Sequence, residues 1–177
     1  MEFIVGQKVC YPGQGVCVVD EIPSKQIGDQ DLRFYSLRIL NDNSNILVPV
    51  NNALTIGLRP LISSRECRSL IARLSKDFEA ISSDWKIRAR EFTAKLQSGD
   101  IFEAADVLKK LTYLAHEKKL SFREQTLLEK SKFLIVSEIC NAVSDDEEKL
   151  RRKVDKLIEA ACQKHHRSAE TDVAVVH

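Results

Sequence analysis

The spacing of apolar residues changes once along this chain, near residue 62, and this change constrains the fold more than any other feature. Before it, short segments rich in β-branched and aromatic residues alternate with clusters of turn-forming residues. After it, apolar residues recur with the 3.6-residue period of an α-helix, proline is absent and Gly99 is the single glycine. The pattern predicts an α+β fold in which a β module is followed by a helical module.

The first region, residues 1–62, has the residue pattern of a small β domain. We predict strands over residues 8–11, 15–19, 34–40 and 46–50, with turns near residues 12–15, 27–30 and 41–45. Four or five short strands joined by tight turns indicate a strongly bent antiparallel sheet or a small barrel. Pro49 has no amide hydrogen, so we expect it on an edge strand or at a bulge.

The second region, residues 63–165, is predicted to be a compact all-α domain of about five helices. Helix starts are indicated by capping patterns at Ser63, Asp100 and Ser121 and by the four acids after Ser144, and another helix is expected from about Asp84. The apolar side of the first helix is expected to continue to Phe78 and Ile81. Residues 166–177 are small and polar, and we predict that they form a flexible tail.

Charge is distributed unevenly between these regions. The 177 residues carry 27 basic and 26 acidic side chains, but residues 63–143 alone have a net charge of +3, whereas the segments before and after have −1 each. No apolar run is long enough for a membrane helix, and the start lacks the pattern of a signal peptide, so we expect a cytoplasmic protein with no membrane partner. The basic excess is typical either of a solvated helix face or of a stripe that contacts phosphates.

Trp85, the only tryptophan, lies at the predicted start of the second helix. Helical periodicity places it on one face with Ala89, Phe92 and Leu96, which is typical of a core anchor. The polar residues that precede it and the cations that follow it favour a different role, an exposed wedge for the DNA minor groove. Packing of a cation on the indole is a third interpretation. The solvent exposure of Trp85 discriminates between burial and the other two.

Catalytic and metal-binding motifs are missing from the sequence. It has no P-loop, nucleophile elbow or H-E-x-x-H motif, and the Gly13-Gln14-Gly15 turn lacks the third glycine of a dinucleotide fingerprint. The five cysteines have no C-x-x-C spacing, which is typical of structural thiols. We therefore predict no enzyme activity, no catalytic residues, no cofactor and no bound metal.

Four segments resemble the CarD/CdnL/transcription-repair-coupling-factor family. They are VGQKVCYPGQGV at residues 5–16, VPV and GLR at 48–50 and 57–59, WKIR and KLQSGD at 85–88 and 95–100, and LSFRE at 120–124. The resemblance implies a bacterial transcription regulator with two partners. A Tudor-like domain of residues 1–62 would bind the lobe of the RNA polymerase β subunit, and a helical domain of residues 63–165 would contact promoter DNA.

On the polymerase side, the resemblance implies three contact positions. Lys25 matches a basic residue near the start of the second hairpin, and Ile27 matches an apolar neighbour. Leu47 stands where relatives carry a second basic residue, just before VPV. We expect the protein to act as a monomer.

On the DNA side, the resemblance implies that Trp85 wedges into the minor groove at the upstream edge of the transcription bubble and stabilises the open complex. Lys86, Arg88 and Arg90 would hold the phosphates around it. Ile87 and Gln125 occupy positions that are basic in some relatives. The alternative function is a protein–protein adaptor whose helical domain binds a protein partner in place of DNA.

Overall fold

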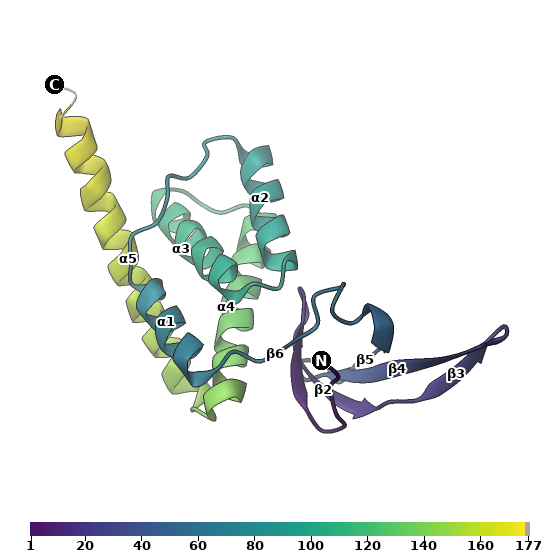
Figure 1. Cartoon of the computed structure of the whole chain (residues 1–177). Coiled ribbons are helices and arrows are strands. Elements are labelled where there is room, and N and C mark those ends of the chain that lie inside the picture. Colours follow the sequence, from purple (N-terminus) through teal and green to yellow (C-terminus); the bar gives the residue numbers. More distant parts are fainter. Residues whose placement is uncertain (176–177) are drawn as a thin grey trace. The chain divides into compact units, whose positions relative to one another are not determined.

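A computed structural model describes residues 1–175 of the chain and divides it into two compact units, Met1–Leu61 and Ile62–His177 (Figure 1). The first unit is an antiparallel sheet and the second is a bundle of helices, which confirms the predicted α+β fold class. The two are described separately below as the β unit and the helical unit. In the described range, no helix combines the length and the apolar content needed to cross a membrane.

Six short strands form the sheet of the β unit within residues 1–175. They are β1 (Lys8–Tyr11), β2 (Gly15–Glu21), β3 (Ser24–Ile27), β4 (Gln30–Ile39), β5 (Asn45–Pro49) and β6 (Arg59–Pro60), and a 3-10 turn (Val50–Asn52) follows β5. The long strand β4 pairs with β3 near its start, with β2 near its end, and with β5. All of these pairs are antiparallel. Pro49 ends β5, whose ladder is with β4, as expected for an edge strand.

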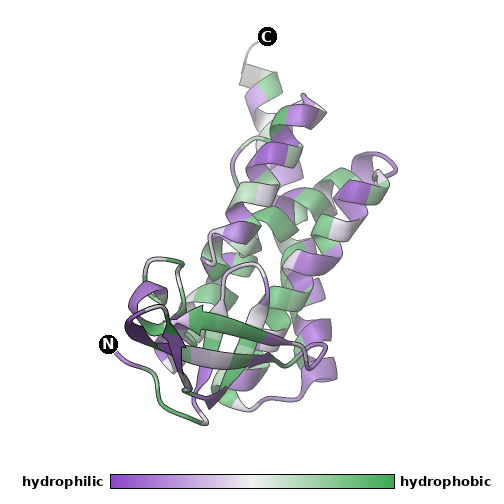
Figure 2. Cartoon of the chain, turned by 90° about the vertical axis from the view of Figure 1, so that its right-hand side faces the viewer, coloured by the Kyte–Doolittle hydropathy of each residue, from purple (hydrophilic) through white to green (hydrophobic). Residues whose placement is uncertain are grey.

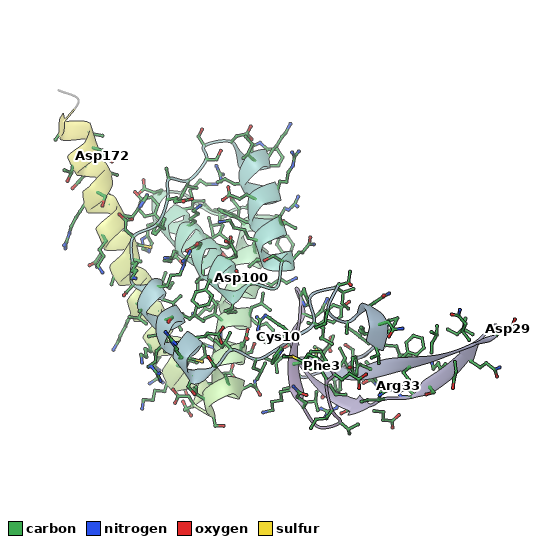
Figure 3. All side chains as sticks on the ribbon, viewed as in Figure 1. Phe3, Cys10, Asp29, Arg33, Asp100 and Asp172 are labelled. Atoms are coloured by element: carbon green, nitrogen blue, oxygen red, sulfur yellow. The ribbon has the colours of Figure 1, made fainter. Side chains whose placement is uncertain are left out.

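The core of the β unit lies on one face of this sheet. Alternate residues of β4, Tyr35, Leu37 and Ile39, point inward and are buried. The ring of Phe3 packs edge-on against Tyr35 with 5.6 Å between centroids, and the Phe3 amide donates a hydrogen bond to the Tyr35 hydroxyl. The β3–β4 hairpin turns at Gly28, whose φ of +63° favours glycine, and Asp29 lies at its tip (Figure 3). Strand β3 escaped prediction because its four residues are all exposed and show no apolar alternation.

Five α-helices make up the helical unit within the described part of the chain. They are α1 (Ser64–Leu74), α2 (Trp85–Gln97), α3 (Ile101–Glu117), α4 (Phe122–Val143) and α5 (Glu147–Val175). The other four helices pack on α3, and their ribbons alternate between hydrophobic and hydrophilic residues (Figure 2). Ser63 and Ser121 form the capping boxes that the sequence predicts, and Asp84 and Asp100 cap α2 and α3.

Helix α1 ends earlier than its apolar pattern predicts. It stops at Leu74, so Phe78 and Ile81 lie in a non-helical segment, residues 75–84, that still packs on the core. The buried ammonium of Lys109, on α3, donates to the carbonyls of Arg73 and Lys76 at 3.0 and 3.4 Å and satisfies acceptors that a longer helix would use itself. The predicted extension of α1 to Ile81 was wrong, and the sequence carries no sign of this because Lys109 lies far along the chain from these carbonyls.

Helix α5 extends further than its sequence predicts. The flexible tail expected over residues 166–177 is helical as far as Val175, and residues 176–177 lie outside the described residues. A side chain of this part of α5 bonds to the 75–84 segment, since the Ser168 hydroxyl donates to the Asp77 carboxylate at 2.8 Å. This contact gives the helix a surface to pack on, which composition alone does not reveal.

Candidate functional site

Trp85 is the first residue of α2 and its side chain is exposed. The carboxylate of Asp84 accepts a hydrogen bond from the Lys86 amide at 2.8 Å and fixes the start of the helix at this point. Trp85 is 62% exposed, whereas Ala89, Phe92 and Leu96 on the same face are buried. The core-anchor interpretation is therefore wrong, because the indole lies one turn before the part of α2 that packs on the core.

One cation lies close to the exposed indole, and a second is exposed on the same helix. The Lys86 ammonium is 5.7 Å from the centroid of the Trp85 ring, which is a cation–π distance. Arg90, one turn further along α2, is exposed. Of the residues predicted to contact DNA, Trp85, Lys86 and Arg90 thus share the solvent-facing start of α2.

Arg88 does not belong to this exposed group. It is 5% exposed, and its Nη1 atom donates to the carbonyls of Ser82 and Ser83 at 2.9 Å each. Its Nη2 atom donates to Glu124 Oε1 at 3.0 Å. Because the guanidinium is directed at protein acceptors and shielded from solvent, the phosphate contact predicted for Arg88 is replaced by a structural role. The sequence carried a signal of this burial, because Arg88 precedes the buried Phe92 by four residues and therefore lies on the same face of α2.

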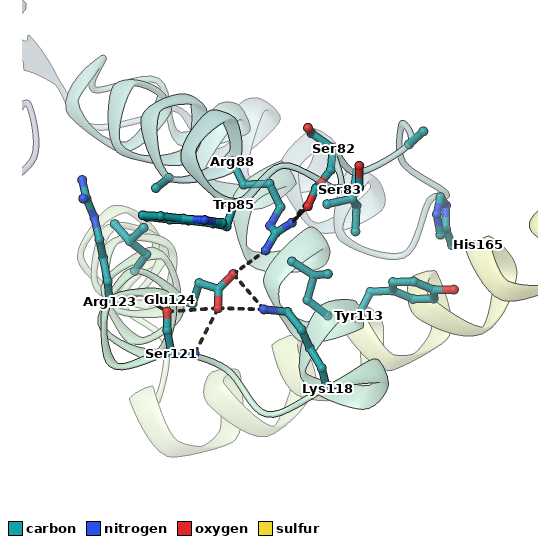
Figure 4. A pocket seen from close by; sticks show the side chains of 15 residues that line it. Ser82, Ser83, Trp85, Arg88, Tyr113, Lys118, Ser121, Arg123, Glu124 and His165 are labelled. Atoms are coloured by element: carbon teal, nitrogen blue, oxygen red, sulfur yellow. Dashed lines mark hydrogen bonds and ion pairs between the residues drawn. The ribbon is translucent and has the colours of Figure 1, made fainter.

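Glu124 is the acceptor at the centre of this arrangement (Figure 4). Its carboxylate accepts hydrogen bonds from the Ser121 amide and hydroxyl at 3.0 Å each and from the Lys118 ammonium at 3.1 Å, in addition to Arg88. Burial disfavours the charged form, but these hydrogen bonds outweigh it and lower the pKa of Glu124 from 4.5 to about 2. The W-x-x-R and L-S-x-x-E motifs are therefore joined through a single buried ion pair.

A groove of about 870 Å³ opens beside Trp85. Its apolar lining includes Ile81, Ala89, Leu114 and Leu127, and the side chain of Arg123 stands beside the indole (Figure 4). Arg123 is exposed and was not among the predicted site residues. The capping box supplies a signal for it, because the two residues between Ser121 and Glu124 occupy the solvent-facing first turn of α4.

Two further apolar side chains are exposed in this part of the helical unit. Ile87 is 54% exposed on α2, and Phe122 is 90% exposed at the start of α4. Phe122 also went unpredicted, and it occupies the other outward position of the same capping box.

The three predicted polymerase-contact residues lie on one face of the β unit. Lys25 and Ile27 are two residues apart on β3, and strand register pairs Lys25 with Leu32 and Leu47 with Ser36. Residues two apart share a face, so this register places all three on the side opposite to the buried Tyr35. Ile27 and Leu47 are 55% and 46% exposed, and the Lys25 ammonium lies 6.0 Å from the Phe34 ring. We call Lys25, Ile27, Leu32, Phe34 and Leu47 the outer face.

Leu32 and Phe34 complete the outer face although the motif comparison did not predict them. Both are partly exposed, on a strand whose alternate residues Tyr35 and Leu37 are buried. Strand alternation was the signal that could have found them. The face combines apolar surface with one cation. Elsewhere in residues 1–175, no group of three or more His, Cys, Asp and Glu side chains is arranged to hold a metal ion.

Two family models match the chain, one for each unit. "CarD-like/TRCF RID domain" matches residues 3–62, and "CarD, C-terminal domain" matches residues 69–155. A curated protein of Bacillus subtilis (strain 168), named "Putative transcription factor YdeB", is 23% identical over 137 residues, which span 77% of this chain and 90% of that protein. A solution NMR structure of the 72-residue N-terminal domain of Myxococcus xanthus CarD is 39% identical, covers 33% of this chain and 79% of its own, and has a TM-score of 0.29.

The buried pair predicts how stability depends on pH. Because the native pKa of Glu124 is about 2 and its ordinary value is 4.5, the pair contributes stability above pH 4.5 that is lost as pH falls toward 2. We expect Glu124→Gln to lower the free energy of unfolding at pH 7 by about 3 kcal/mol, because it leaves Arg88 buried without a counter-ion. We also expect the variant to lose less stability than the wild type on acidification.

Urea unfolding followed by circular dichroism at 222 nm measures this, since the α-helices of the described residues all lie in the helical unit. Glu117→Gln, at an exposed position near the end of α3, is the matched control and should follow the wild type. Parallel pH profiles for Glu124→Gln and the wild type would rule out the pair as the source of this dependence.

Proposed function

The chain belongs to the CarD-like family of transcription regulators and carries that family's RNA polymerase-interacting domain, and from this membership we propose that it stabilises the open promoter complex. In this proposal the β unit binds the lobe of the polymerase β subunit. The helical unit contacts promoter DNA at the upstream edge of the transcription bubble, where Trp85 inserts into the minor groove. The protein acts in the cytoplasm as a monomer and is not an enzyme.

The exposed Trp85 is the observation that carries the DNA contact. An indole that is 62% exposed at a helix start has its flat apolar surface available to a partner. Apolar side chains of this kind separate base steps from the minor groove, while neighbouring cations bind the phosphates. Lys86 and Arg123 lie beside the indole, Arg90 is exposed further along α2, and these three are the cations we assign to the phosphates.

The modest charge of the helical unit fits a DNA contact that depends on the polymerase. A net charge of +3 over residues 63–143 supports only a few phosphate contacts. Docking of the β unit on polymerase would raise the local concentration of the helical unit near DNA, so weak contacts suffice. The outer face supports that docking, because it places apolar side chains and Lys25 together on an exposed sheet surface.

The adaptor function has its own supporting observation. The groove beside Trp85 is lined mainly by apolar side chains, and Phe122 at 90% exposure is a typical protein-contact residue. In this alternative the same surface binds a protein. Footprinting of polymerase–promoter complexes separates the two functions, because unchanged protection at the upstream fork favours the adaptor.

The wedge predicts a specific effect of Trp85→Ala. We expect the variant to fold and to bind polymerase as the wild type does, because the indole makes little contact with the core. We expect the open complex to dissociate roughly tenfold faster, since stacking of a base on an aromatic ring contributes about 1–3 kcal/mol. Competitor challenge of preformed promoter complexes measures the lifetime. Val143→Ala, another exposed apolar position, is the control, and equal lifetimes for both variants would exclude the wedge.

The different placement of Arg88 and Arg123 gives a second prediction. Arg123→Gln should leave the free energy of unfolding unchanged and reduce by about one the slope of log affinity against log salt for promoter binding by the polymerase complex. Arg88→Gln should instead destabilise the helical unit, because it removes the partner of Glu124. Urea unfolding and a salt titration of both variants test this. A loss of stability in Arg123→Gln would contradict the assignment.

The outer face makes a third prediction, for polymerase binding. The double variant Lys25→Glu/Leu47→Glu should abolish binding to the isolated β lobe, because it reverses the charge and places a second carboxylate on the apolar surface. Lys8→Glu, at an exposed position of β1, is the matched control and should bind normally. Binding is measured by calorimetry with each full-length protein. Retained binding by the double variant would move the docking surface elsewhere.

A further inference from the structure

Residues 75–84 form the non-helical segment that leads from α1 to Trp85. Fixing the backbone of one residue costs about 1–2 kcal/mol, so a ten-residue segment without helical hydrogen bonds needs other contacts to hold one conformation. Besides the Lys109 ammonium, which bonds to the Lys76 carbonyl, the structure supplies two sets of contacts, one near each end. The set next to Trp85 is Arg88, which donates to the carbonyls of Ser82 and Ser83.

The second set comes from α5, far along the chain. The Asp77 carboxylate receives the Ser168 hydroxyl at 2.8 Å and faces the His165 Nδ1 atom at 2.8 Å. The His165 ring is stacked on Phe78, with 4.1 Å between centroids and 13° between planes. The Lys164 ammonium donates to the Ser75 carbonyl. These α5 residues therefore contact Ser75, Asp77 and Phe78 of the segment.

Only those α5 side chains that face the segment make these contacts, as two adjacent histidines show. His165 also meets the Tyr113 ring edge-on at 4.9 Å, so it is enclosed between α3 and the segment, and its side chain is 16% exposed. The neighbouring His166 is 60% exposed and pairs with Glu170 on its own helix. Of these two adjacent histidines, His165 contacts the segment and α3, whereas His166 pairs only along its own helix.

We infer that the C-terminal part of α5 positions Trp85, with Lys164, His165 and Ser168 as positioning residues that hold the 75–84 segment. The inference rests on the proposed role of Trp85 and deepens it. It also gives a role to a part of the chain that lies beyond residues 69–155, the range matched by the C-terminal family model. His165 lines the far end of the groove that Trp85 lines (Figure 4), so the segment between them forms one wall of it.

The test uses Trp85 itself, because a single tryptophan reports on its own motion. In the free full-length protein, His165→Ala should reduce the slowly decaying part of the Trp85 fluorescence anisotropy by about twofold, since the segment gains freedom. His166→Ala is the matched control and should leave the anisotropy unchanged. Ser168→Ala, which removes one hydroxyl, should reduce it less, and it keeps the test available if His165→Ala unfolds.

Anisotropy of the free protein tests the positioning role of α5, and the lifetime of the promoter complex tests the proposed function of Trp85. Equal anisotropy in Ser168→Ala, His165→Ala and His166→Ala would overturn the positioning role of α5. If positioning holds, His165→Ala should also shorten the open-complex lifetime, by less than Trp85→Ala does. A change in anisotropy with wild-type lifetimes for both His165→Ala and Trp85→Ala would support positioning and contradict the proposed function of Trp85.

Discussion

The ion pair between Arg88 and Glu124 connects the elements that surround Trp85. Arg88 belongs to α2, Glu124 belongs to the capping box of α4, and the Nη1 atom of Arg88 bonds to the end of the 75–84 segment. Burying two charges is costly, and this cost is offset only when the other donors and acceptors of both groups are also bonded. Glu124 meets that condition through Ser121 and Lys118. Loss of either charged partner would leave the other buried, so the start of α2 depends on both.

The elements themselves could be predicted from the sequence because their causes are local. A capping serine, an alternating strand or the loss of proline acts over a few residues, and these signals predicted the α+β order and four of the five helix starts. The start expected at Ser144 was wrong, because Ser144 adopts the left-handed conformation that ends α4, and α5 begins at Glu147. The segment from 75 to 84 could not be predicted in this way. Its conformation depends on Lys109 and His165, which are distant in sequence and identifiable only after the helices have packed.

The candidate site was predictable to a similar extent. Trp85, Lys86 and Arg90 are exposed, as the predicted DNA contact requires, so motif position and exposure agree for them. Arg88 was assigned wrongly because charge was read without regard to the helical face that it shares with Phe92. Arg123 and Phe122 could not be predicted from the L-S-x-x-E motif, because they occupy its two unspecified positions. In each case the role of the residue depends on whether its side chain points toward the core or toward solvent, and composition does not reveal this direction.

The capping box at the start of α4 has a consequence for how such a surface changes over evolution. Ser121 and Glu124 satisfy each other, and this reciprocal bonding holds the turn whatever residues stand between them. We expect Phe122 and Arg123, both exposed, to vary with little loss of folding stability, while the residue at position 123 remains beside Trp85. Affinity for a partner can be adjusted at these two positions independently of the fold, which makes them the natural site of divergence among related chains.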